Sequence, residues 1–236
     1  MDAQYIQTIK NNLGGVLSRI RTASQGEETE LMLATKTVPA EVINYVNENF
    51  GISLIGENKV QELLEKYPYL DRQKFRIHII GHLQTNKVRQ IIDKVDMIQS
   101  LDRYELAAEI SKRAVAKKIK MPVLIEINIG REEQKGGVYP EKAIDFIKEI
   151  AELEGLDIQG LMTMAPAKIS SEQYREYFRQ TKALFDEISA LDIKGVKMKT
   201  LSMGMSDSYE EAAQCGATMV RVGSAIFGKR EYPSKI

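Results

Sequence analysis

The stretch over residues 31–66, LMLATKTVPAEVINYVNENFGISLIGENKVQELLEK, decides the fold because it contains the same two-part unit twice. Each unit starts with a short apolar run, at 31–35 and 52–56, that has the length and composition of a buried strand. A stretch with the apolar spacing of an amphipathic helix follows each run, at 40–49 and 59–66. The stretch therefore predicts the order strand, helix, strand, helix.

The same alternation continues along the rest of the chain. Further strands are expected at 76–80, 97–101, 123–129, 159–164, 199–203 and 219–222, and further helices at 104–117, 141–153 and 172–191. Regular alternation of strands and helices predicts a parallel sheet. Eight strands in about 200 residues favour a closed barrel over a doubly wound open sheet, which would show the same alternation. We expect an α/β fold, a single TIM (β/α)8 barrel over about 31–228.

One further helix is predicted at the N-terminus, before the first strand. Ile9, Leu13, Val16 and Ile20 form an apolar stripe at helical spacing, which predicts a helix over about 2–21. Too few residues follow the eighth strand for a helix after it, so we expect the N-terminal helix to fill that place in the outer ring. The whole chain, 1–236, is thus predicted to be one domain.

The composition argues against several classes of protein. Lys and Arg number 33 and Asp and Glu number 33, so no overall positive charge is present to bind nucleic acid. The first residues lack the apolar core of a signal peptide, and no stretch has the length of a membrane span. The single cysteine, Cys215, cannot form an intrachain disulfide and is interpreted as a small buried hydrophobic residue. We expect a cytoplasmic protein that binds neither nucleic acid nor a membrane.

A TIM barrel carries its functional site at the carboxyl ends of its strands. Met32, Ala34 and Lys36 share one face of the first strand, so Lys36 is expected at the mouth of the barrel. A lysine in a poorly solvated mouth is a candidate nucleophile toward an aldehyde. The alternative is a rim lysine that reaches water, and position alone leaves the two open.

The ends of the seventh and eighth strands are rich in glycines and hydroxyl groups. The seventh strand ends with Ser202-Met203-Gly204-Met205-Ser206, and Gly223 and Ser224 follow the eighth strand. Barrels commonly bind phosphate at this place, although the serine and aspartate at 206–207 could equally cap the next helix. Arg221 is expected to point into the mouth, toward a structural carboxylate or a ligand atom. Together with Lys36, these residues suggest a phosphorylated aldehyde.

Other potential sites are weaker. His78 and His82 lie well apart along an extended strand and have no nearby thiolate or carboxylate cluster, so no metal site is predicted. The glycine-rich stretch 130–137 lacks the spacing of a phosphate-binding or dinucleotide-binding loop, and we interpret it as a mobile rim loop that could act as a lid.

Six motifs in order carry a resemblance to a known family. They are ATKTVP at 34–39, GENKVQE at 56–62, IHIIGHLQTNK at 77–87, GLMTMAP at 160–166, LSMGMSD at 201–207 and RVGSAIFG at 221–228. With them the chain resembles, nearly end to end, the pyridoxal phosphate homeostasis proteins, which in turn resemble the N-terminal barrel of alanine racemase. Ile77, where the family often has tryptophan, and residues 128–133 depart from the pattern; the second departure leaves open the role of the rim loop.

The resemblance implies a role for each candidate residue. Lys36 is then the Schiff-base lysine for pyridoxal 5'-phosphate, and Asn58 lies beside the cofactor ring. Arg221 faces the pyridine nitrogen. The phosphate ligands implied by the resemblance are Ser202, Met203, Gly223 and Ser224.

The function implied by the resemblance is vitamin B6 homeostasis: the protein sequesters pyridoxal phosphate and delivers it to cofactor-dependent apoenzymes, without substantial catalysis and without catalytic residues. The alternative is a pyridoxal-phosphate-dependent enzyme such as an amino-acid racemase. A Schiff-base aldolase is disfavoured because the sixth strand ends Met164-Ala165-Pro166, without a lysine. Nothing in the sequence of the predicted outer helices indicates a subunit interface, so a monomer is expected.

Overall fold

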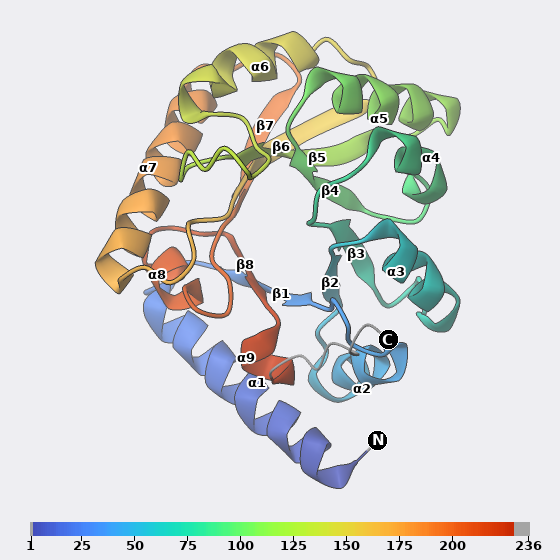
Figure 1. Ribbon diagram of the computed structural model, residues 1–236, viewed down its shortest axis with the longest axis vertical. Coiled ribbons are helices and arrows are strands. Elements are labelled where there is room, and N and C mark those ends of the chain that lie inside the picture. Colours follow the sequence, from blue (N-terminus) through green and yellow to red (C-terminus); the bar gives the residue numbers. More distant parts are fainter. Residues whose placement is uncertain (1, 229–236) are drawn as a thin grey trace.

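The computed structural model describes residues 2–228 and has the predicted barrel. Eight parallel strands pair in chain order, and β1 closes the ring by pairing with β8. Figure 1 shows the helices arranged around the outside of the strands. The strands are β1 (Glu30–Ala34), β2 (Leu54–Glu57), β3 (Arg76–Ile79), β4 (Met97–Leu101), β5 (Met121–Ile127), β6 (Leu156–Thr163), β7 (Val196–Ser202) and β8 (Met219–Val222).

Most of the helices lie where the sequence predicted them. The α-helices are α1 (Ala3–Ala23), α2 (Ala40–Phe50), α3 (Val60–Lys66), α4 (Val88–Ile91), α5 (Tyr104–Ala116), α6 (Ala143–Ile150), α7 (Ser171–Ala190), α8 (Tyr209–Gln214) and α9 (Ser224–Phe227). Short 3-10 helices are η1 (Tyr67–Tyr69), η2 (Thr85–Lys87) and η3 (Pro140–Lys142). The start of α7 is a capping box, in which Ser170 and Gln173 satisfy each other's backbone amides.

Two sequence expectations need correction. A short helix, α9, does follow the eighth strand, because Gly223 turns the chain directly into one helical turn. Cys215 is half-buried rather than buried, since it ends α8 at the surface and its thiol lies 3.7 Å from the carbonyl oxygen of Arg175.

The N-terminal helix α1 packs in the outer ring beside the last elements of the chain, as expected. Ile9, Leu13 and Val16 are fully buried on its inner face. The side-chain amide of Asn12 donates to the carbonyl of Ile226 in α9 at 3.1 Å, and Arg19 contacts α8. In Figure 1, α1 runs alongside α8 and α9. The helix therefore covers the place where the first and last strands of the barrel meet.

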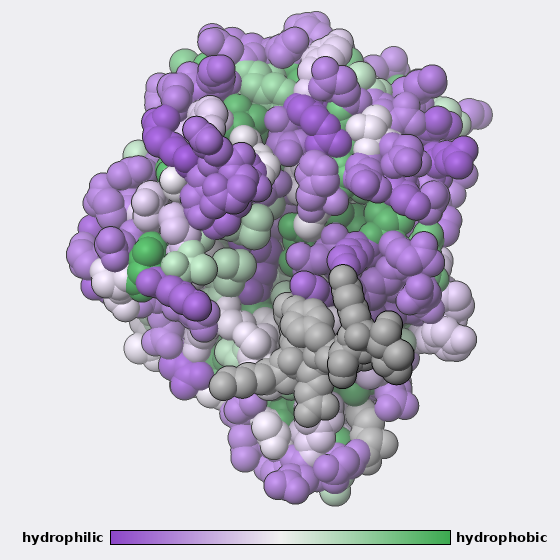
Figure 2. Space-filling view, viewed as in Figure 1, coloured by the Kyte–Doolittle hydropathy of each residue, from purple (hydrophilic) through white to green (hydrophobic). Residues whose placement is uncertain are grey.

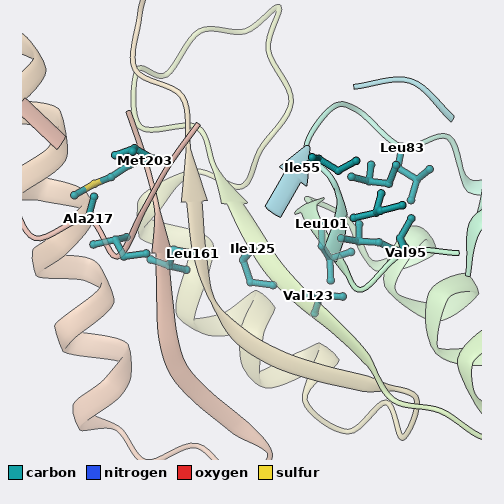
Figure 3. Close-up of a cluster of buried hydrophobic side chains, with 14 of the residues drawn as sticks. Ile55, Leu83, Val95, Leu101, Val123, Ile125, Leu161, Met203 and Ala217 are labelled. Atoms are coloured by element: carbon teal, nitrogen blue, oxygen red, sulfur yellow. The ribbon is translucent and has the colours of Figure 1, made fainter. Parts of the chain in front are cut away.

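The hydrophobic core has two parts, separated by the strands. The larger part lies between strands and helices, and Figure 3 shows a section of it, including Ile55, Leu101, Val123 and Leu161. Inside the barrel are two small clusters, one formed by Met32, Leu54, Ile80 and Met219 and the other by Met97, Leu124 and Met162. Because side chains alternate along a strand, a residue two positions beyond an interior one shares its face and lies nearer the mouth of the barrel. No helix among residues 2–228 combines the length and apolar character needed to cross a membrane.

Candidate functional site

A cavity of about 520 Å³ opens at the carboxyl ends of the strands. Its volume is within the usual range of small-molecule sites. The lining residues come from the ends of β1, β2, β3, β6 and β8 and from the loop after β7: they are Ala34, Lys36, Asn58, Ile80, Met164, Met205, Ser206, Asp207, Arg221, Gly223 and Ser224. Five of the seven residues that the sequence analysis proposed as cofactor ligands are among them, namely Lys36, Asn58, Arg221, Gly223 and Ser224.

Lys36 reaches the cavity because of the phase of β1. Met32 is fully buried inside the barrel, Ala34 lines the cavity, and Lys36 follows two residues later on the same face. In the pairing of β1 with β8, Met32 stands opposite Arg221. Lys36 and Arg221 therefore come from neighbouring strands, β1 and β8, and lie on the same side of the cavity.

Arg221 is buried and held by two hydrogen bonds. Its Nη1 donates to the hydroxyl of Ser202 at 2.7 Å, and its Nη2 donates to the carbonyl of Thr163 at 2.8 Å. Burial lowers the pKa of Arg221 to about 10, and the charge of Glu126 opposes this effect. The guanidinium stays charged at neutral pH and is fixed in orientation at the floor of the cavity.

Ser202 supports Arg221 from below rather than lining the cavity. Its side chain is fully buried, and while it accepts from Arg221, its hydroxyl donates to Oε1 of Gln99 at 2.7 Å. Nε2 of Gln99 lies 2.9 Å from Nδ1 of His78. Met203 is also buried, in the outer core, and its amide donates to the carbonyl of Met219 in the sheet.

Two ionisable side chains inside the barrel are biased toward their neutral forms. Burial raises the pKa of Glu126 to about 7; the nearby charge of Asp102 raises it too, and Arg221 opposes both. Burial lowers the pKa of His78 to about 4. The interior below the cavity is thus a poorly solvated region in which Arg221 carries the stable charge.

Ser206 is a site residue for which the sequence left two roles open, a hydroxyl donor to phosphate or a helix cap. Its hydroxyl accepts from the amides of Gly223 and Ala225, each at 3.2 Å. A hydroxyl that accepts in this way still has its own proton to donate, and Ser206 lines the cavity. Gly204 makes this loop possible, because its φ is 85° and a Cβ there would lie 2.4 Å from the Cβ of Ala212.

The rim loop is tied to the end of β5 by Asn128. The side-chain amide of Asn128 donates to the carbonyls of Glu132 and Lys135, and its Oδ1 accepts from the amide of Glu132 at 3.1 Å. His82 also lies outside the cavity lining, 3.9 Å from Asp102 and largely exposed. Among residues 2–228, no group of three or more His, Cys, Asp or Glu side chains is arranged to hold a metal ion.

Comparison with known proteins gives consistent matches over almost the whole chain. Residues 7–231 match the family described as "Alanine racemase, N-terminal domain". A protein of Aquifex aeolicus (strain VF5) named pyridoxal phosphate homeostasis protein is 45% identical over 225 residues, 93% of this chain and 97% of its own length. The protein of the same name from Haemophilus influenzae is 37% identical, over 95% of this chain and 97% of its own length.

A solved structure agrees with these relatives. PipY of Synechococcus elongatus PCC7942, in a structure described as having PLP bound, superimposes with a TM-score of 0.82 at 27% identity and covers 93% of this chain and 100% of its own. The fold and the sequence similarity lead to the same conclusion. The chain belongs to the family of pyridoxal phosphate homeostasis proteins, whose barrel is that of the alanine racemase N-terminal domain.

Proposed function

We propose that this protein binds pyridoxal 5'-phosphate and serves its homeostasis, holding the cofactor and delivering it to apoenzymes without substantial catalysis. The observation that carries the proposal is the cavity, where Lys36, Arg221 and a loop rich in hydroxyl and amide groups meet around one volume. The names of the relatives, and the PLP described in the PipY structure, support the same ligand.

The residues present fit the chemistry of this cofactor. Lys36 offers the primary amine that an aldehyde requires. Ser206 and Ser224 offer hydroxyl donors for a phosphate dianion, and Gly223 lets the backbone approach it closely. The apolar side chains of Ile80 and Met164 also line the cavity and suit an aromatic ring.

The bound cofactor would supply an electrophilic aldehyde and an electron-withdrawing ring. Two of the five N–H groups of Arg221 donate to Ser202 and Thr163. A remaining N–H group would donate a hydrogen bond to the ring nitrogen of the cofactor. A fixed cation at that nitrogen disfavours its protonation, which makes the ring a weaker electron sink. Arg221 would therefore bind the ring and at the same time restrain its reactivity.

Ser224→Ala and Ser206→Ala are each expected to weaken cofactor retention by about 1.5 to 3 kcal/mol, because each removes a hydroxyl donor to a charged phosphate. Equilibrium dialysis of the variants with pyridoxal phosphate measures the effect. Ser18→Ala, on the exposed face of α1, is the control and should match the wild type. Unchanged retention in both site variants would mean that the phosphate binds elsewhere.

Delivery is tested with a pyridoxal-phosphate-dependent apoenzyme. The loaded protein should restore its activity even when a scavenger removes free pyridoxal phosphate from solution. If the scavenger abolishes the recovery completely, the cofactor passes through solution, and the proposal of direct delivery is wrong.

The alternative function is a racemase-like enzyme, which the match to the alanine racemase barrel favours. Racemisation needs a base on each face of the substrate carbanion, and Lys36 serves only one. Within the described part of the chain, 2–228, the other ionisable side chains that line the cavity are Asp207 and Arg221. Arg221 is charged at neutral pH and cannot act as a base, so the second base would have to be Asp207 or a residue from outside the cavity such as His82.

The loaded protein is therefore expected to lack Lys36-dependent racemisation or half-transamination in the ordinary enzyme range of roughly 1 to 1000 per second. A panel of L- and D-amino acids measures this, with Lys36→Ala as the blank. Turnover in that range would favour the enzyme instead. Asp207→Ala and His82→Ala would then identify the second base.

We further propose that the protein acts as a monomer. The large hydrophobic side chains exposed among residues 2–228 are scattered over several elements: Leu17, Tyr69, Tyr104, Val115, Ile119, Leu191 and Met205. The face in Figure 2 is mostly hydrophilic, with hydrophobic residues in small patches. Light scattering of the purified protein tests the proposal, and a stable dimer would contradict it.

A further inference from the structure

A cluster of charged side chains lies directly behind Lys36, outside the cavity. Nζ of Lys66, in α3, lies 2.8 Å from Oε1 of Glu57 and 2.7 Å from Oε1 of Glu62. Glu57 is fully buried, and the side chains of Lys66 and Glu62 are 11% and 19% exposed. We call Glu57, Glu62 and Lys66 the anchoring triad.

The anchoring triad binds both peptide groups next to Lys36. Nζ of Lys66 donates to the carbonyl of Thr35, the residue before Lys36, at 2.8 Å. Glu62 accepts a hydrogen bond from the amide of Thr37, the residue after it. Glu57 accepts from the Thr35 hydroxyl at 2.7 Å.

The chain at this point needs such support, because it leaves β1 in an unusual conformation. Thr37 has a φ of 64°, in the left-handed region that residues other than glycine rarely adopt. The conformation persists only when surrounding contacts hold it. The triad supplies contacts on both sides of Lys36, so it fixes the direction in which the lysine leaves the strand.

Stability alone is a poor explanation for the triad. Burial raises the pKa of Glu57, while its ion pair and hydrogen bond with Lys66 lower it. Among the described residues, Oε2 of Glu57 is also buried without a hydrogen-bond partner. Buried ion pairs of this kind often add less stability than well-packed apolar side chains would.

We infer that the anchoring triad is a set of positioning residues for Lys36, which hold its backbone so that the ε-amine meets an aldehyde bound in the cavity. The inference rests on the proposed function. None of the three residues lines the cavity, so each acts through Lys36 rather than on the ligand. In the step concerned, the Lys36 nitrogen forms a C=N bond to the aldehyde carbon, and the aldehyde oxygen leaves as water with two protons from the amine.

The test separates covalent attachment from binding of the ring and phosphate. Borohydride reduces the C=N bond, so timed additions give the rate at which pyridoxal phosphate becomes attached to Lys36. Pyridoxine 5'-phosphate has an alcohol in place of the aldehyde, and its affinity reports the remaining contacts. Thermal unfolding of each variant reports whether the barrel is intact.

Glu62→Ala removes the acceptor for the Thr37 amide and is expected to slow attachment about tenfold or more, because misplacing a reacting group by about an ångström can have such an effect. Its affinity for pyridoxine phosphate should be unchanged. Glu62→Gln keeps an acceptor oxygen and should recover most of the rate. Glu65→Ala, an exposed glutamate of the same helix, is the matched control and should attach cofactor like the wild type.

Lys66→Met removes the centre of the triad and should slow attachment more than Glu62→Ala. If this variant does not fold, Glu62→Ala and its glutamine counterpart decide. Wild-type attachment rates in folded Glu62→Ala would overturn the inference, and so would equal losses of attachment rate and pyridoxine phosphate affinity. A wild-type protein that binds neither compound would instead overturn the proposed function itself.

Discussion

Lys36→Ala is expected to abolish covalent attachment of pyridoxal phosphate completely. Among residues 2–228, Lys36 is the only lysine that lines the cavity, so it is the amine placed to take the aldehyde. The variant mixed with cofactor should lack the visible absorbance of the linked form, and borohydride should fix no cofactor to the protein. Lys59→Ala, which removes an exposed lysine close by in sequence, is the control and should behave like the wild type.

The same variant should keep its fold and part of its affinity. Lys36 is half-buried at the rim, and the residues proposed for the phosphate, Ser206 and Ser224, belong to other loops. Pyridoxine phosphate should therefore bind to Lys36→Ala nearly as well as to the wild type. A borohydride-stable adduct at full occupancy in Lys36→Ala would show that another lysine is used.

Glu126→Gln is expected to raise the free energy of unfolding at about pH 8 by up to about 3 kcal/mol and to change it little near pH 4.5. The pKa of Glu126 in the folded protein is about 7, above the ordinary 4.5, so the folded state binds the proton more tightly than the unfolded state does. That contribution to stability is fully present below pH 4.5 and is lost as the pH rises through 7. Glutamine is neutral throughout and avoids the loss.

His78 has the opposite effect on the pH dependence. Its pKa in the folded protein is about 4, below the ordinary 6.5. The unfolded state therefore takes up a proton first as the pH falls, and stability decreases from 6.5 toward 4. Between about pH 4.5 and 6.5 the two groups offset each other in the wild type, and Glu126→Gln should reveal the slope due to His78.

Urea unfolding of the cofactor-free protein across this pH range measures both effects. Glu133→Gln, which neutralises an exposed carboxylate of the rim loop, is the control and should leave the pH dependence unchanged. An equal change in unfolding free energy at low and high pH in Glu126→Gln would contradict the assignment of this slope to Glu126.

The barrel and the position of Lys36 could be predicted from the sequence because both depend on periodicity. Short continuous apolar runs alternate clearly with helical stretches of period 3.6, and the alternation of side chains along β1 puts Lys36 on the face of Met32 and Ala34. The ends of the elements were less certain. The short helices α4 and α9 are single turns that carry too little periodicity to be recognised.

The position of Ser202 shows why the rest of the site was harder to predict. It is the last residue of β7 and points into the barrel, while Met203 points to the outer core. Adjacent residues of a strand face opposite sides, so the side chains of Ser202 and Met203 do not reach the same region. Sequence reasoning also missed Gln99, although its position two residues after Met97, an interior residue, gave a signal: a polar side chain in the barrel needs partners.

The pairing of β1 with β8 also has a consequence for how the protein is made. On the ribosome, Lys36 emerges long before Arg221, Gly223 and Ser224, so a nascent chain has only half of the site. The halves meet only when the last strand docks beside the first and the ring is sealed. A ligand that contacts residues from both β1 and β8 binds the closed barrel and not its open precursors. Its binding therefore stabilises the closed form by mass action. We therefore expect a ligand of this cavity to stabilise the closed barrel late in folding, so that cells short of that ligand hold less of the folded protein.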